Sequence, residues 1–183
     1  MIAKPEGRAA RELVIVFLDL SVYTQDARRT ADDARLADIV DGYYERVADR
    51  CGAAGGTVVK FIGDGALLVF PVERADAATQ ALFDLKSDVD DWLAALGWES
   101  RLVVKAHCGS VVAGPYGARD EKRFDVIGDE VNVAARLPTR SFALSAQAFR
   151  RLSPEVRRRF KKHTPPITYI PVEDRRPSNV AKG

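Results

Sequence analysis

Two polar side chains on one predicted helix have the chemistry to act on a phosphate group. Residues 124–136 are typical of a short apolar strand, a turn at Gly128, a capping residue at Asp129 and then a helix. Asn132 and Arg136 are four residues apart on that helix, so they share one face. An amide can orient a hydroxyl, and a guanidinium can stabilise charge on a phosphate. Such a pair is also common on solvated helices, so its meaning depends on the rest of the chain.

Two carboxylates are candidates for a cation site. Asp19 follows the apolar run 13–18, and Asp64 lies between two glycines in a predicted hairpin turn. Strand ends and turns present side chains at exposed edges. Brought together, the two carboxylates can hold divalent cations, with a backbone carbonyl such as that of Leu20 as a further oxygen ligand. Taken singly, each is equally typical of turn chemistry.

The elements that must position these residues alternate between strands and helices. Apolar periodicity predicts strands at 13–18, 57–62, 66–70, 102–106, 143–144 and 167–172, with helices at 31–51, 75–96 and 146–160 besides the one after Asp129. Residues 109–117 are predicted as a loop or hairpin. The pattern predicts an α+β sandwich, one sheet with helices on one face. Residues 1–11 form a polar lead-in, 12–174 the domain, and 175–183 a flexible tail.

The composition is that of one globular domain in a reducing compartment. The 183 residues are 46% apolar and 30% charged, and the net charge of +2 gives no strong attraction to nucleic acid or membrane. Cys51 and Cys108 have neither a disulfide framework nor metal-ligand spacing. Signal-peptide and membrane-span patterns are missing from the sequence, so we expect a cytoplasmic protein.

Basic residues are concentrated in the C-terminal third of the chain. They form either a solvated helix face or a contact for phosphate or an acidic partner. These residues are Arg150, Arg151, Arg157, Arg158, Arg159, Lys161 and Lys162.

Three segments taken together resemble the class III nucleotide cyclases. Residues 17–24 (FLDLSVYT), 60–64 (KFIGD) and 124–136 (FDVIGDEVNVAAR) occur in the family's order and at familiar spacing. The resemblance runs from about residue 13 to 152. It implies a ferredoxin-like α+β domain with a mostly antiparallel sheet, which works as a head-to-tail homodimer.

The resemblance gives the two carboxylates a role in metal binding. It implies that Asp19 and Asp64 bind two divalent ions, Mg²⁺ or Mn²⁺, with the Leu20 carbonyl assisting. Each active site takes this metal-binding pair from one chain and its other residues from the partner. The implied reaction converts a nucleoside triphosphate to a 3′,5′-cyclic nucleotide and pyrophosphate, and the product is read by a separate effector protein.

The remaining matched residues bind the substrate and stabilise the transition state. By resemblance, Lys60 and Asp125 hydrogen-bond the base, Asn132 positions the ribose, and Arg136 stabilises the transition state. In adenylate cyclases the Lys and Asp pair recognises adenine, so conversion of ATP to cAMP is narrowly preferred. One donor and one acceptor also suit cytosine or uracil. A stand-alone pyrimidine cyclase, making cUMP or cCMP in bacterial anti-phage defence, is therefore the alternative.

The chain departs from the family pattern in places. Val22 stands where the family usually has Gly, and the connection after the helix of Asn132 is shorter than usual. The hairpin that commonly offers a triphosphate-binding Lys is not visible, which leaves Lys161, Lys162 or Arg140 as substitutes. An inactive dimerisation or regulatory module is the alternative of another class. A nucleic-acid-binding domain of this fold would require exposed aromatic side chains and a basic sheet face, which fits poorly.

Overall fold

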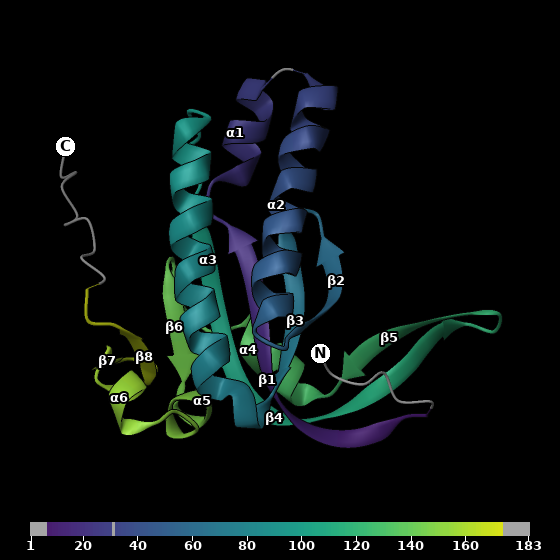
Figure 1. The fold of residues 1–183 in the computed structure, drawn as a ribbon, viewed down its shortest axis with the longest axis vertical. Coiled ribbons are helices and arrows are strands. Elements are labelled where there is room, and N and C mark those ends of the chain that lie inside the picture. The colour runs from purple at the N-terminus through teal and green to yellow at the C-terminus, as the bar shows by residue number, and fades with distance from the viewer. Residues whose placement is uncertain (1–6, 31, 174–183) are drawn as a thin grey trace.

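One mixed sheet organises the chain, and a computed structural model describes residues 7–30 and 32–173 (Figure 1). The strands are β1 (Ala9–Leu20), β2 (Thr57–Ile62), β3 (Gly65–Pro71), β4 (Leu102–Ala118), β5 (Glu121–Ile127), β6 (Phe142–Ser145), β7 (Phe160–His163) and β8 (Thr168–Pro171). The helices are α1 (Tyr23–Thr30), α2 (Asp33–Ala53), the 3₁₀ turn η1 (Val72–Arg74), α3 (Ala75–Ala95), α4 (Asp129–Ala135), α5 (Ala146–Arg150) and α6 (Pro154–Arg157).

The sheet has its two central strands in β1 and β4. Its order is β2-β3-β1-β4-β6-β8-β7, and β5 pairs with β4 outside this path. Within the described residues, β4 and β6 are parallel and every other neighbouring pair is antiparallel. The predicted α+β sandwich with a mostly antiparallel sheet is confirmed.

Alternation along β1 assigns the two faces of the sheet. Val14, Val16 and Leu18 are buried in the main core with side chains of α2 and α3. Ile15 faces the other way, into a smaller cluster that includes Ala134 of α4. A central strand covered on both faces reads as a continuous apolar run, which is what residues 13–18 show. The long helices cover one face, as predicted, and the short α4 covers part of the other.

A long hairpin projects from the sheet (Figure 1). β4 continues to Ala118. β5 pairs with it along the hairpin, with Ile127 opposite Val112 at one end and Glu121 opposite Ala118 at the other. The strand predicted at 102–106 therefore extends to 118, and of the two alternatives for 109–117 the hairpin is right and the loop is wrong. Gly114 allows the backbone of β4 to approach the backbone just before β1 closely. A Cβ on Gly114 would lie 2.8 Å from the Arg8 Cα.

The predicted helix at 146–160 is wrong, because the chain forms two short helices and a strand there. α5 ends at Arg150, α6 begins at Pro154, and Phe160 already belongs to β7. The Ser153 hydroxyl accepts the Val156 amide hydrogen (3.5 Å) and caps α6. Proline lacks the amide hydrogen that a continuous helix needs and fits only its first turn.

Other boundaries also differ from the sequence-based ones. Gly128 rather than Asp129 occupies the N-cap of α4, and Asp129 begins the helix, where its charge favours the helix dipole. α1 was not predicted, because it has no apolar stripe: Asp26 is its one buried side chain. β1 begins at Ala9, inside the predicted lead-in. The predicted tail at 175–183 lies outside the described residues.

In the described ranges, no helix combines the length and apolar character that crossing a membrane requires.

Candidate active site

The two candidate metal-binding carboxylates meet at the end of β1. Asp19 is the second-last residue of β1, and Asp64 lies in the turn between β2 and β3, the strand that pairs with β1. Partial burial, followed by the charge of Asp64 and a hydrogen bond with it, raises the pKa of the Asp19 carboxyl. The nearby Lys105 charge and the Leu20 amide oppose this rise. Crowded carboxylates of this kind fit a hard divalent cation, which removes their repulsion.

Within residues 7–30 and 32–173, the pair is not part of a larger ligand cluster. Among the described residues, no group of three or more His, Cys, Asp and Glu side chains could hold a metal ion. A cation at Asp19 and Asp64 therefore needs further oxygen ligands from the backbone, such as the Leu20 carbonyl, or from a bound phosphate.

The two candidate base-binding residues form an ion pair. The Lys60 ammonium on β2 donates to the Asp125 carboxylate on β5 at 2.6 Å. Asp125 also accepts the Val126 amide hydrogen at 2.8 Å. The Lys60 and Asp125 side chains are 44% and 24% exposed. A partly solvated pair of this kind adds little stability. Because both side chains are partly exposed, their donor and acceptor groups are accessible to a ligand.

An aromatic contact fixes the turn that carries Asp64. The Tyr44 hydroxyl of α2 donates to the Gly63 carbonyl at 2.6 Å. The Tyr44 ring also stacks on Phe61 of β2, with ring centroids 3.9 Å apart. The apolar spacing predicts only a helix at 31–51, whereas the structure makes Tyr44 a support of the candidate metal site.

The third pair is Asn132, within α4, and Arg136, the residue that caps the C-terminal end of α4. Val131 and Ala134 of this helix pack against the sheet, which leaves Asn132 and Arg136 on its exposed side. In the part of the chain that the structure describes, neither side chain makes a hydrogen bond or ion pair, and nothing joins them directly to the other two pairs. The described part of the chain thus presents three separate pairs of polar residues. In the third pair, the amide and the guanidinium are available to a ligand.

The loop after Asp19 is strained at Val22. Val22 has φ 53°, a conformation that a β-branched side chain rarely adopts and that costs about 1–3 kcal/mol. The resemblance expects Gly at this position, and Gly adopts the conformation freely. The strained residue immediately precedes α1, so α1 must be held in place by other contacts.

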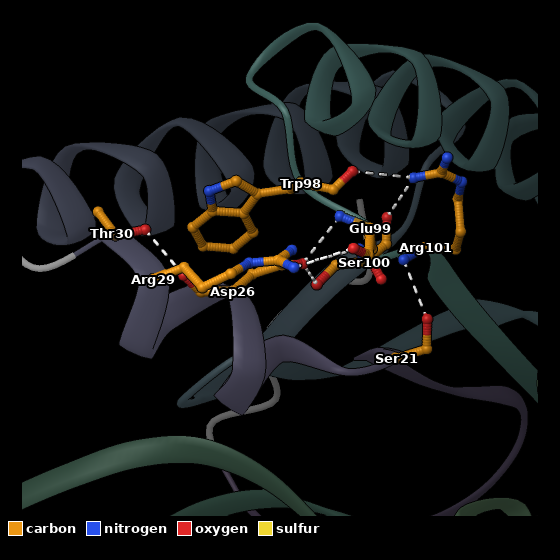
Figure 2. Close-up of polar contacts among 8 residues, drawn as sticks. All are labelled: Ser21, Asp26, Arg29, Thr30, Trp98, Glu99, Ser100 and Arg101. Atoms are coloured by element: carbon orange, nitrogen blue, oxygen red, sulfur yellow. Dashed lines mark hydrogen bonds and ion pairs between the residues drawn. The ribbon is translucent and has the colours of Figure 1, made fainter.

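A buried carboxylate anchors α1 to the segment between α3 and β4 (Figure 2). Asp26 is 1% exposed and accepts the amide hydrogens of Ser100 (2.8 Å) and Glu99 (3.1 Å), together with the Ser100 hydroxyl. Arg29 bridges Asp26 and Glu99. Burial alone would raise the pKa of the Asp26 carboxyl, but the hydrogen bonds from Ser100, Glu99 and Arg29 outweigh it and lower the pKa. In a second contact, the Ser21 hydroxyl oxygen accepts the Arg101 amide hydrogen (3.0 Å), which ties the same loop to the residue just before β4.

Replacing this anchor is expected to destabilise the fold in a pH-dependent way. Asp26→Ala leaves the buried Ser100 groups unpaired and should lower the free energy of unfolding by about 3 kcal/mol at pH 7. The folded-state pKa of Asp26 lies below its unfolded value of about 3.9. Its contribution is therefore complete above that value and is lost as the pH falls through the folded pKa. Urea unfolding at several pH values measures both effects.

The matched control for this prediction is Asp49→Ala. Asp49 is exposed on α2, so its loss should change stability by no more than about 0.5 kcal/mol. Equal stability of Asp26→Ala and Asp49→Ala at pH 7 would mean that the carboxylate network does not hold α1.

Sequence reasoning missed three polar residues that lie close to α4. Lys105 and His107 are on β4, and Glu130 is on α4; both β4 residues contact α4. A signal was present, because Lys105 and His107 occupy alternate positions of an otherwise apolar strand and so share one face. Their partners are 23 to 30 residues away, beyond the reach of local patterns.

Several of the C-terminal basic residues contact their own chain. Arg151 pairs with Glu12, and Arg159 lies over the Phe83 ring at 4.0 Å. Arg157 donates to backbone carbonyls of α5. These contacts favour a structural role for Arg151, Arg157 and Arg159 over binding of phosphate.

Comparison with known proteins agrees with the α+β fold and identifies the family of the chain. Residues 7–163 match the family described as Adenylate and Guanylate cyclase catalytic domain, so the chain belongs to the class III adenylate and guanylate cyclase catalytic domain family. Cyclases of this class generally depend on divalent metal ions.

Individual relatives support the same family. The chain is 32% identical over 158 residues to Adenylate cyclase 2 of Rhizobium meliloti (strain 1021), covering 79% of this chain and 43% of the relative. The adenylyl cyclase CyaB from P. aeruginosa superposes with a TM-score of 0.77 at 20% identity, covering 92% of this chain and 97% of that one. The guanylate cyclase domain of RhGC from Catenaria anguillulae, in complex with GTP, gives a TM-score of 0.72 at 19% identity, covering 85% and 87%.

The two structural likenesses describe the fold alone. The chain spans less than half the length of the curated relatives it matches.

Proposed function

We propose that this chain is a metal-dependent nucleotide cyclase, which converts a nucleoside triphosphate into a 3′,5′-cyclic nucleotide and pyrophosphate. The observation that carries the proposal is the meeting of Asp19 with Asp64 in a chain of the cyclase family. The ion pair of Lys60 with Asp125 supports it as a recognition element for the base.

The proposed metal ligands are Asp19, Asp64 and the Leu20 carbonyl, which would hold two Mg²⁺ or Mn²⁺ ions. When bound, such ions lower the pKa of a hydroxyl and neutralise a triphosphate. The chain's own contribution is to keep two repelling carboxylates together, with the Asp64 turn supported by Tyr44.

The other proposed residues act on the ribose and on the reacting phosphate. Asn132 orients the ribose so that the 3′-oxygen lies in line with the α-phosphorus. The 3′-oxygen bonds to that phosphorus, the bond to pyrophosphate breaks, and the hydroxyl proton leaves. Arg136 supplies fixed positive charge where the phosphate becomes more anionic in the transition state.

We further propose that two chains are required. Within the described residues, Asn132 and Arg136 make no direct contact with Asp19 or Asp64, which supports sites shared across a head-to-tail homodimer. Each site would combine the metal-binding pair of one chain with four residues of its partner, namely Lys60, Asp125, Asn132 and Arg136. We expect the enzyme in the cytoplasm, with its product read by a separate effector.

The proposed substrate is ATP, narrowly ahead of a pyrimidine nucleotide. The amine and carboxylate of Lys60 and Asp125 match the ring acceptor and exocyclic amine of adenine. The name of the Rhizobium meliloti relative, an adenylate cyclase, favours the same base. One donor and one acceptor can also hydrogen-bond cytosine or uracil, so synthesis of cCMP or cUMP is the alternative.

A direct assay tests the proposed function. The purified chain is incubated separately with ATP, GTP, CTP and UTP, with Mg²⁺ or Mn²⁺, and products are identified by mass spectrometry. We expect cAMP from ATP. Formation of cUMP or cCMP alone would replace ATP by a pyrimidine substrate, and no cyclic product from any nucleotide would favour an inactive regulatory module.

A further inference from the structure

One face of β4 forms a platform beneath α4. Lys105, His107 and Gly109 are alternate residues of the strand, paired with Phe17, Ile15 and Leu13 of β1. The β1 residues of this register belong to the apolar cluster that packs against α4. The three β4 residues therefore share the face of the sheet on which α4 lies.

The N-terminal end of α4 is bound to this platform through Glu130. The Glu130 carboxylate lies 2.5 Å from Nε2 of His107, whose side chain is fully buried. Nδ1 of the same ring lies 2.8 Å from the Ser145 hydroxyl, which also accepts the Ala148 amide hydrogen. A carboxylate can only accept, so Nε2 donates its hydrogen to Glu130, while the Ser145 hydroxyl pairs with Nδ1 on the other side of the ring. The ring is thus fixed from both sides.

The C-terminal end of α4 is bound through Lys105. Its ammonium donates to the Ala135 carbonyl at 3.0 Å, the residue immediately before Arg136. The last carbonyls of a helix have no partner within the helix, and a cation there favours the helix dipole. Lys105 also lies close enough to Asp19 for its charge to act on that carboxyl.

Glycine at 109 makes room for the first of these contacts. A Cβ on Gly109 would lie 2.6 Å from Cγ and 2.8 Å from Cβ of Glu130. Both atoms are near the helix backbone, so a side chain at 109 would push α4 itself away from the sheet. The close approach of Glu130 to His107 therefore depends on Gly109.

We propose that β4 clamps α4 at both ends and that Lys105, His107 and Glu130 are positioning residues for Asn132 and Arg136; this inference rests on the proposed function of that pair. α4 has seven residues, too few to be stable by itself, so its place depends on contacts with the sheet. Val131 and Ala134 supply the apolar part, and the two polar contacts fix the helix along its axis.

The clamp is tested by loosening each end separately. Lys105→Met keeps the apolar stem and removes the C-terminal contact, and Glu130→Ala removes the N-terminal one. Both should lower kcat by about 10- to 100-fold with little change in KM, because the guanidinium is misplaced while substrate binding persists. Amides of residues 133–136 should exchange with deuterium about tenfold faster.

Conservative variants and matched controls separate positioning from general damage. Glu130→Gln retains an acceptor for His107 and should keep most of the activity that Glu130→Ala loses. Glu155→Gln, exposed on α6, and Lys122→Met, at the tip of the β4–β5 hairpin, should leave kcat and α4 exchange unchanged.

The outcomes distinguish the clamp from the proposed function. If the wild-type chain forms no cyclic nucleotide, the proposed function fails, and if Arg136→Ala retains full activity, only the proposed role of Arg136 fails. In both cases α4 exchange still reports on the clamp. If the wild-type chain is active but Lys105→Met and Glu130→Ala keep both wild-type kcat and wild-type exchange, the clamp does not exist. Faster exchange with unchanged kcat, or a rise in KM alone, would refute the positioning role.

Discussion

Arg136→Ala is expected to lower kcat for cyclic nucleotide formation by about 10³-fold, with a much smaller change in KM. In the proposed mechanism the guanidinium interacts mainly with charge that develops on the α-phosphate in the transition state. Arg136 is exposed at the end of α4, and no described residue pairs with its side chain. Its loss should therefore leave stability nearly unchanged. Steady-state kinetics with the best substrate, beside a thermal unfolding curve, measure both quantities.

Two further variants sharpen this expectation. Arg136→Lys keeps the charge but not the planar fork of donors, so it should recover only part of the lost rate. Arg50→Ala removes an exposed arginine from the last turn of α2, far along the chain from α4, and should retain wild-type kinetics. Near-wild-type kcat for Arg136→Ala would remove this residue from the chemistry and leave α4 without its proposed role.

The elements of the fold were predictable wherever one apolar pattern dominated. β1 shows a continuous apolar run because both of its faces are covered, and α3 shows helical spacing because its one inner face is buried. The prediction failed at 146–160, where Pro154 and the Ser153 cap divide an otherwise continuous apolar pattern. It also missed α1, since tertiary hydrogen bonds to Asp26 rather than an apolar stripe hold that helix.

The candidate site was predictable only as far as motifs extend. The resemblance put Asp19 with Asp64 and Lys60 with Asp125, and the structure brings each of these pairs together. The metal-binding and base-binding roles of these pairs remain proposals, as do the roles of Asn132 and Arg136. The supports of the site escaped prediction, because their partners are distant in sequence: Asp26 and Ser100 are 74 residues apart. Polar contacts of this kind depend on the finished sheet register and have no local periodicity.

Asp64→Ala is expected to abolish cyclisation with Mg²⁺ and with Mn²⁺, lowering kcat to the detection limit of a mass-spectrometric assay. Asp64 is one of two proposed carboxylate ligands, and no third His, Cys, Asp or Glu among the described residues is placed to replace it. Burial and then the charge of Asp64 raise the pKa of Asp19, so losing Asp64 relieves a repulsion and should not destabilise the fold. Asp84→Ala, an exposed carboxylate pairing with Gln80 on α3, is the matched control and should remain active.

Mixing the inactive Asp64→Ala and Arg136→Ala chains then tests whether each site is shared. In a mixed dimer, one site receives the intact Asp64 of one chain and the intact Arg136 of the other, whereas the second site carries both defects. Random pairing gives about half mixed dimers with one working site each, so about a quarter of wild-type activity should return. A site built within one chain gives no recovery, because every chain carries one lesion. Two mutants that exchange subunits and still stay inactive together would therefore exclude the shared site. Recovery would mean that Asp64 of one chain and Arg136 of the other act on the same substrate molecule.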